Sequence, residues 1–206
     1  MHDFWMFEGL MSSGNGALHV TSTHCDDTIA RSLCAGSLNA LSLHGCSPEQ
    51  AGLESGAEAV LIGGLNPTFR QYLLEEFTAV GIRAVTASGE EEIAGISPDN
   101  ICNRTLLGMG AQLEMTTALR TAMFAPGKNT IADRATNLLP SFWTFTAATR
   151  RAIDRVEAGP PSMPPPCGAM TVERRKGARS VLLWSSIRWR LERRPQWTPS
   201  VHVGSA

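Results

Sequence analysis

The sequence has few of the features that mark membrane, secreted or disulfide-stabilised proteins. No apolar run approaches the ~18 residues that a membrane span needs. The N-terminal segment "MHDFWMFEGL" has no basic region, long apolar stretch or small-residue cleavage site, so it does not match a secretory signal. The five cysteines are an odd number with no C-x-x-C pair, which argues against a disulfide framework and a zinc knuckle. We therefore expect a cytoplasmic protein with free thiols and no membrane partner.

Signatures of nucleotide-binding and repeat proteins are also missing. The sequence contains no "GKS" motif in a glycine-rich loop, which argues against a site for nucleotide phosphates. It shows no internal repeat, so a repeat architecture is not expected. The hydrophobic fraction of 43% and the charged fraction of 18% are typical of a globular protein. A chain of 206 residues can form one domain with a sizeable core and an appendage.

The charge distribution divides the chain after Gly159. Residues 1–159 carry 10 basic and 17 acidic side chains, whereas residues 160–206 carry 8 basic and 2 acidic ones. The second part also holds seven of the twelve prolines and three of the five tryptophans. We expect an α/β domain over 1–159 and a disordered tail over 160–206. Basic segments with interleaved aromatics also occur in nucleic-acid-binding proteins, but this tail lacks a sustained apolar face, so we do not expect a nucleic-acid partner.

Apolar runs and helical patterns alternate in the first part, as in an α/β domain. The predicted strands are 3–9, 17–23, 39–45, 57–66, 82–87 and 111–116. The predicted helices are 25–37, 67–80, a short one near 117–124, and 140–159. The runs 39–45 and 57–66 are continuously apolar, which is typical of strands covered on both faces. We therefore predict a mixed, mostly parallel sheet flanked by helices.

His44 is the first candidate functional residue, because ligands of open α/β sheets bind beyond the carboxyl ends of the strands. It follows the apolar run "ALSL" and precedes Gly45. Neutral imidazole is a common zinc ligand, and a glycine allows another group to approach the backbone closely. A lone histidine at a strand end is more often structural than metal-binding, so both interpretations stay open.

Glu114 lies within the otherwise apolar run "AQLEM". Burying an unpaired carboxylate costs several kcal/mol, and the loss of hydration raises its pKa toward neutrality. Such a glutamate is a candidate general base. The alternative is a salt bridge to Arg104 or Arg120, and the spacing alone does not choose between the two.

The loop "DNICNR" at 99–104 offers a third set of candidates. The planar guanidinium of Arg104 suits a carboxylate, and the neighbouring Asn100 and Asn103 can donate amide hydrogens. An arginine on a polar loop is, in the other interpretation, part of the solvated surface.

Five stretches together resemble the family of phage and bacterial poly-γ-glutamate hydrolases. They occur in the family's order and spacing over roughly residues 3–157, and they read "FEGLMSSGNGALHVTSTHCDD", "LSLHGC", "VLIGGLNPTFRQYL", "SPDNICNR" and "GAQLEM". The resemblance implies a zinc-carboxypeptidase-like fold that hydrolyses γ-glutamyl amide bonds with one zinc ion. It also implies that His44 is a zinc ligand, that Glu114 activates the metal-bound water, and that Arg104, Asn100 and Asn103 bind the glutamate side of the substrate.

One feature of the family is missing from these 206 residues. The family's first two zinc ligands come from a His-Gly-Gly segment and a following glutamate on a strand that would precede residue 1, and His24 is the nearest substitute here. A catalytic zinc needs three protein ligands and a water. We therefore expect an N-terminally truncated domain with an unpaired edge inside its sheet and impaired zinc binding. The alternative functions are a non-catalytic relative that binds acidic peptides and a phage-related nucleic-acid accessory protein that acts through the basic tail.

Overall fold

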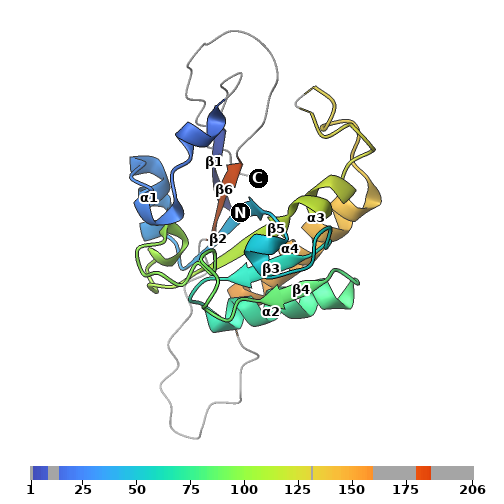
Figure 1. The fold of residues 1–206 in the computed structure, drawn as a ribbon. Coiled ribbons are helices and arrows are strands. Elements are labelled where there is room, and N and C mark those ends of the chain that lie inside the picture. The colour runs from blue at the N-terminus through green and yellow to red at the C-terminus, as the bar shows by residue number, and fades with distance from the viewer. Residues whose placement is uncertain (1, 9–13, 131, 160–179, 187–206) are drawn as a thin grey trace, which may run out of the picture.

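The computed structural model describes residues 2–8, 14–130, 132–159 and 180–186 (Figure 1). Its strands are β1 (Asp3–Glu8), β2 (Asn39–Cys46), β3 (Val60–Gly63), β4 (Ala84–Thr86), β5 (Ala111–Thr116) and β6 (Ser180–Ser186). Its α-helices are α1 (Thr28–Ala35), α2 (Pro67–Ala79), α3 (Thr117–Ala122) and α4 (Pro140–Ala158). Short 3-10 helices are η1 (Asn15–Leu18), η2 (Ser22–His24), η3 (Glu49–Ala51) and η4 (Ile101–Asn103).

The strands form one sheet in the order β1-β6-β2-β5-β3-β4. Parallel pairing joins β1 to β6, β6 to β2, β2 to β5, and β3 to β4, whereas β3 and β5 are antiparallel. This arrangement confirms the predicted mixed, mostly parallel sheet. Because β2 and β5 run in the same direction and in register, their carboxyl ends reach the same edge of the sheet.

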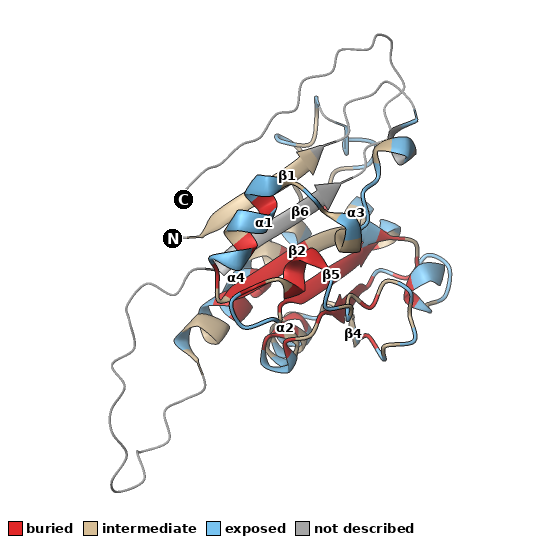
Figure 2. Cartoon of the chain, turned by 90° about the vertical axis from the view of Figure 1, so that its left-hand side faces the viewer, coloured by how far each residue is buried: buried red, intermediate tan, exposed pale blue. Residues whose placement is uncertain are grey.

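The main hydrophobic core lies between one face of the sheet and the helices α2 and α4. Leu41 of β2 and Leu113 of β5 are fully buried in this core. The rings of Phe77 from α2 and Phe145 from α4 stack with their centroids 4.9 Å apart. Figure 2 shows that buried residues are concentrated in β2 and β5. These two strands are therefore held firmly, which fixes the side chains on their opposite face.

The helix α2 begins at the predicted Pro67 and ends at Ala79, one residue before the predicted end. The Asn66 side chain accepts a hydrogen bond from the backbone N–H of Phe69, and Pro67 is the first helical residue. Gly81 follows the helix with a φ of 75°, a left-handed conformation that glycine adopts readily. Among the described residues, none of the helices has both the length and the apolar character required to cross a bilayer.

The predicted strand over 17–23 is wrong. The segment instead contains the end of η1 and the start of η2, and Val20 between them is 48% exposed. β-branched residues favour a strand when they can pack against a covered surface, and this segment lies on the outside of the domain.

The predicted disordered tail is wrong for residues 180–186, which form β6. This strand pairs with β1 on one side and with β2 on the other. The described strands thus form one continuous six-stranded sheet, without the unpaired inner edge that the sequence analysis expected. Residues 160–179 and 187–206, on which the nucleic-acid alternative mainly rests, lie outside the described residues.

Candidate active site

The structure places His44 and Glu114 side by side. They are register partners on the neighbouring parallel strands β2 and β5, close to the carboxyl ends of both. Register partners point to the same face of a sheet, and adjacent strands are about 4.8 Å apart. Two of the residues predicted from sequence therefore share one face of the sheet, opposite the face that packs against α2 and α4.

The His44 imidazole is half-buried between the sheet and the η2 segment. Ser22 Oγ lies 3.3 Å from its Nε2 atom. Burial, with a smaller contribution from the nearby His19, lowers the pKa of His44 to about 4. The ring is consequently neutral at pH 7, the state in which a histidine can accept a hydrogen bond or bind a metal.

The Glu114 carboxyl is buried, with 6% of the residue exposed. Burial raises its pKa to about 8, while a hydrogen bond from Gln112 and the charge of Arg120 act in the opposite direction. No ion pair joins Glu114 to Arg104 or Arg120 in the part of the chain that the structure describes. Of the two interpretations from sequence, the structure thus favours a desolvated carboxyl over a salt bridge.

A chain of amides orients one oxygen of Glu114. Asn100 Oδ1 accepts a hydrogen bond from Cys102 N at 3.1 Å, which turns Asn100 Nδ2 toward Gln112 Oε1 at 2.9 Å. The Gln112 Nε2 atom then donates to Glu114 Oε1 at 2.9 Å and to Ile93 O at 3.1 Å. An amide side chain has one donor end and one acceptor end. The backbone N–H of Cys102 therefore sets the donor-to-acceptor direction of every hydrogen bond in this series.

Sequence reasoning did not identify Gln112. The available signal was its position two residues before Glu114, since alternate residues of a strand share a face. Its binding partner Asn100 is separated from it by a loop, so their contact depends on the tertiary structure.

Asn103 organises the loop before β5. It is 2% exposed, and its Oδ1 atom accepts hydrogen bonds from Leu65 N at 3.2 Å and Gly110 N at 3.0 Å. Its Nδ2 atom donates to Gly95 O and Ser97 O, both at 2.8 Å. The side chain thus uses its hydrogen-bonding capacity on backbone groups. Contact of Asn100 and Asn103 with a substrate stays a prediction.

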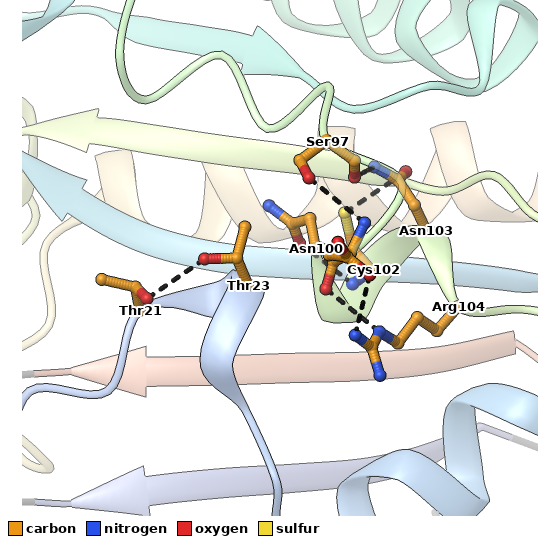
Figure 3. Close-up of polar contacts among 8 residues, drawn as sticks. Thr21, Thr23, Ser97, Asn100, Cys102, Asn103 and Arg104 are labelled. Atoms are coloured by element: carbon orange, nitrogen blue, oxygen red, sulfur yellow. Dashed lines mark hydrogen bonds and ion pairs between the residues drawn. The ribbon is translucent and has the colours of Figure 1, made fainter.

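Arg104 folds back onto its own loop (Figure 3). Its Nε atom donates to Asp99 O at 3.0 Å, and its Nη2 atom lies 3.1 Å from Asp99 Oδ1. Burial raises the pKa of the Cys25 thiol, and the positive charge of Arg104 opposes that rise. The guanidinium is therefore close to the start of α1, and its binding of a carboxylate stays a prediction.

The described residues do not provide a complete metal site. His44 supplies one imidazole, whereas His24 Nδ1 lies 2.9 Å from Thr21 Oγ1. Among the residues that the structure describes, no group of three or more His, Cys, Asp or Glu side chains could hold a metal ion. This set does not fit a catalytic zinc, which needs three protein ligands.

A family model described as "Poly-gamma-glutamate hydrolase" matches residues 1–148. Among curated proteins of Bacillus subtilis (strain 168), the UPF0714 protein YndL is 33% identical over 145 residues, covering 70% of this chain and 54% of YndL. The SPbeta prophage-derived UPF0714 protein YoqZ is 30% identical over 150 residues, covering 73% of this chain and 52% of YoqZ. The chain thus spans about half the length of the curated relatives it matches.

Two solved structures each match about 70% of this chain. A bacteriophage poly-gamma-glutamate hydrolase matches with a TM-score of 0.65 and 32% identity, covering 72% of this chain and 68% of that one. A zinc-free apo form of YndL matches with a TM-score of 0.63 and 30% identity, covering 71% of this chain and 68% of the YndL chain. The family match over residues 1–148 includes His44 and Glu114.

Proposed function

Since the chain belongs to the poly-gamma-glutamate hydrolase family, we propose that it acts on γ-glutamyl amide bonds with Glu114 as the proton-transferring residue. The observation that supports this most is the register pairing of His44 with Glu114 on the polar face of the sheet. A carboxyl with a pKa of about 8 can take up and release a proton near neutral pH.

In the proposed reaction, water attacks the carbonyl carbon of the amide and its proton passes to the Glu114 carboxylate. The C–N bond then breaks, and the same proton is transferred to the leaving nitrogen. The products are a carboxylic acid and an amine. Gln112 donates to Glu114 Oε1, which leaves the second carboxyl oxygen to carry the proton.

Zinc is the expected cofactor, because the solved structure of the relative YndL is described as zinc-free. His44 is the ligand that the described residues offer at this site. One imidazole alone does not fit a catalytic zinc, which needs three protein ligands.

A non-catalytic role is the second candidate function. The incomplete ligand set among the described residues favours it, because a protein that recognises acidic peptides without cutting them needs no metal. The two functions differ in one observable result. A hydrolase shortens poly-γ-glutamate, whereas a binding protein retains it unchanged.

The test uses the full chain, dialysed against zinc and then against buffer. Zinc content is measured by mass spectrometry, and cleavage of poly-γ-glutamate is measured by the appearance of new amino groups. Glu114→Gln keeps the shape of the side chain but cannot accept the proton, so we expect cleavage to fall by about a hundredfold or more. The control is Asp154→Asn, which alters an exposed acid on α4, the helix that covers the other face of the sheet.

Two results bear directly on the proposal. Equal cleavage by the wild-type chain and Glu114→Gln would exclude the role given to Glu114. Binding of poly-γ-glutamate by the wild-type chain without cleavage or zinc would establish the second function instead.

A further inference from the structure

The loop before β5 lies directly against the face of the sheet that carries Glu114. Gly63 is the register partner of Gln112 on β3, and a Cβ atom at Gly63 would collide with Ala94 O. The backbone N–H of Gly64 donates to Ala94 O at 3.0 Å. Because register partners point to the same face, the segment around Ala94 lies on the face of Gln112 and Glu114.

Gly95 packs against the side-chain amide of Gln112. A Cβ atom at Gly95 would lie 3.0 Å from Gln112 Cδ and Oε1 and 3.2 Å from Nε2. Gly95 also has a φ of 67°, a left-handed conformation that other residues rarely adopt. The Asn103 Nδ2 atom holds this glycine by donating to Gly95 O at 2.8 Å. The backbone at Gly95 therefore limits the room in which the Gln112 amide can move.

Gln112 is held so that its donor end faces Glu114. Its Nε2 atom donates to Glu114 Oε1 and to Ile93 O, and its Oε1 atom accepts from Asn100 Nδ2. A rotation of the amide by 180° would place Oε1 against Ile93 O and Nε2 against the Asn100 donor. Gln112 is 4% exposed, so such mismatched groups would be buried without partners. Asn100 and Ile93 thus fix the orientation in either protonation state of Glu114.

Asn100 is buried, and both ends of its amide contact the protein. It is 3% exposed, and its Oδ1 atom caps η4 by accepting from Cys102 N at 3.1 Å. Its Nδ2 atom donates to Gln112 Oε1 at 2.9 Å. Arg104 on the same loop differs, because its side chain is 34% exposed. The two residues, which the sequence analysis grouped as one substrate-binding set, therefore lie in different environments.

We propose that Asn100 is a positioning residue for Glu114, which acts through Gln112 and does not contact the substrate. The inference rests on the proposed function, since it takes Glu114 as the proton-transferring residue. Asn100 fixes the Gln112 amide, and the amide holds Glu114 Oε1, so that the same carboxyl oxygen carries the proton in every turnover. The sequence analysis predicted a substrate contact for Asn100, and the experiment below distinguishes the two roles.

The experiment compares two variants of Asn100 in the full chain in the presence of EDTA. Asn100→Asp keeps the shape and the acceptor for Cys102 N, but it replaces the donor to Gln112 with an acceptor. Asn100→Ser keeps a helix-capping oxygen and is too short to reach Gln112. NMR measures the carbon-13 signal of the Glu114 carboxyl and the nitrogen-15 signal of the Gln112 amide at fixed pH. We expect both variants to shift both signals by more than a line width.

Gln112→Met supplies the background that tests the route of the effect. Asn100→Ser should shift the Glu114 signal in the wild-type chain and leave it unchanged when residue 112 is already methionine. The matched control is Asn129→Asp, which makes the same change of charge as Asn100→Asp at an exposed position and should leave both signals in place. Circular dichroism shows whether each variant is folded, and a misfolded Asn100→Asp leaves the decision to Asn100→Ser.

Calorimetry with a short γ-linked glutamate oligomer separates positioning from substrate contact. We expect Asn100→Ser to bind the oligomer within about twofold of the wild-type affinity, whereas loss of a hydrogen bond to the substrate would weaken binding by up to about tenfold. If the wild-type chain cleaves poly-γ-glutamate, kcat of Asn100→Ser should fall while KM stays unchanged.

The outcomes separate this inference from the proposed function. A shift of the Glu114 signal that disappears in the Gln112→Met background supports the inference even if the wild-type chain cleaves nothing, a result that would count against the proposed function alone. An unchanged Glu114 signal in both Asn100 variants, an equal shift in both backgrounds, or oligomer binding weakened about tenfold overturns the inference even if cleavage is observed.

Discussion

The two faces of the β2–β5 pair have opposite chemical characters, although they are formed by alternate residues of the same strands. On one face, Leu41 and Leu113 pack against α2 and α4. On the other, His44 and Glu114 lie side by side with Gln112 next to them. The apolar face supplies the stability that allows the other face to keep polar groups in a buried position.

The difference has an energetic basis. Burial of apolar surface is favourable by roughly 25 cal/mol per Å². Burial of an ionised carboxyl group is unfavourable, and it raises the pKa of Glu114 to about 8. Glu114 therefore keeps its proton up to about that pH. The buried carboxyl therefore lowers the stability of the fold progressively as the pH rises from 4.5 to about 8.

The largest effect on stability is expected on the apolar face. Leu113→Ala removes a fully buried side chain and leaves a cavity, which should lower the free energy of unfolding by about 2–5 kcal/mol. Urea unfolding measures the change. The matched control is Leu106→Ala, because Leu106 is 65% exposed and its loss should change stability by less than about 0.5 kcal/mol. Equal effects of both substitutions would mean that this face is not the core.

Glu114→Gln should have a pH-dependent effect of opposite sign. The pKa of Glu114 is raised from 4.5 to about 8 by folding, so its contribution to stability is complete below pH 4.5 and lost as the pH rises through about 8. The variant should thus gain up to a few kcal/mol over the wild type at about pH 9 and little at about pH 4. Urea unfolding in EDTA at both pH values tests this, with Asp154→Asn as the control. A difference that does not change with pH would contradict the assigned burial.

Gln112→Met tests the orientation of the carboxyl with a smaller expected cost. It removes the hydrogen bond to Glu114 Oε1 and also leaves Asn100 Nδ2 without its partner, which should lower stability by about 1–3 kcal/mol. If the chain cleaves poly-γ-glutamate, kcat should fall more than KM rises, because the substitution misplaces the proton acceptor. The reverse pattern would assign Gln112 to substrate binding.

Leu43→Val on the apolar face is the smallest change. Leu43 lies within β2 and is only partly buried, so we expect a loss of about 1 kcal/mol or less and unchanged binding of γ-linked glutamate. Thermal unfolding and calorimetry measure the two quantities. A large loss of binding would show that the apolar face also contributes to the site.

The sequence was sufficient to predict the elements that depend on local patterns. The strands β2 and β5 follow from continuous apolar runs, and α2 follows from Asn66, Pro67 and Gly81 at its ends. It also identified His44 and Glu114, because polar residues in buried strands are conspicuous.

Other features depend on contacts between distant parts of the chain. The segment 180–186 has an apolar pattern, but its place between β1 and β2 depends on pairing with strands more than a hundred residues away. The role of Gln112 requires the loop that carries Asn100, and the position of Arg120 requires the space at Gly45. None of these contacts is marked by a local sequence signal.

The most direct test of the account is a titration of the Glu114 carboxyl in the metal-free full chain. Carbon-13 NMR of the labelled glutamate side chains, with the Glu114→Gln variant used to assign the signal, reports its protonation as the pH changes. We expect a midpoint near 8, set by burial on the polar face beside His44. A midpoint near the ordinary value of 4.5 would show a hydrated carboxyl and would contradict the proposed site.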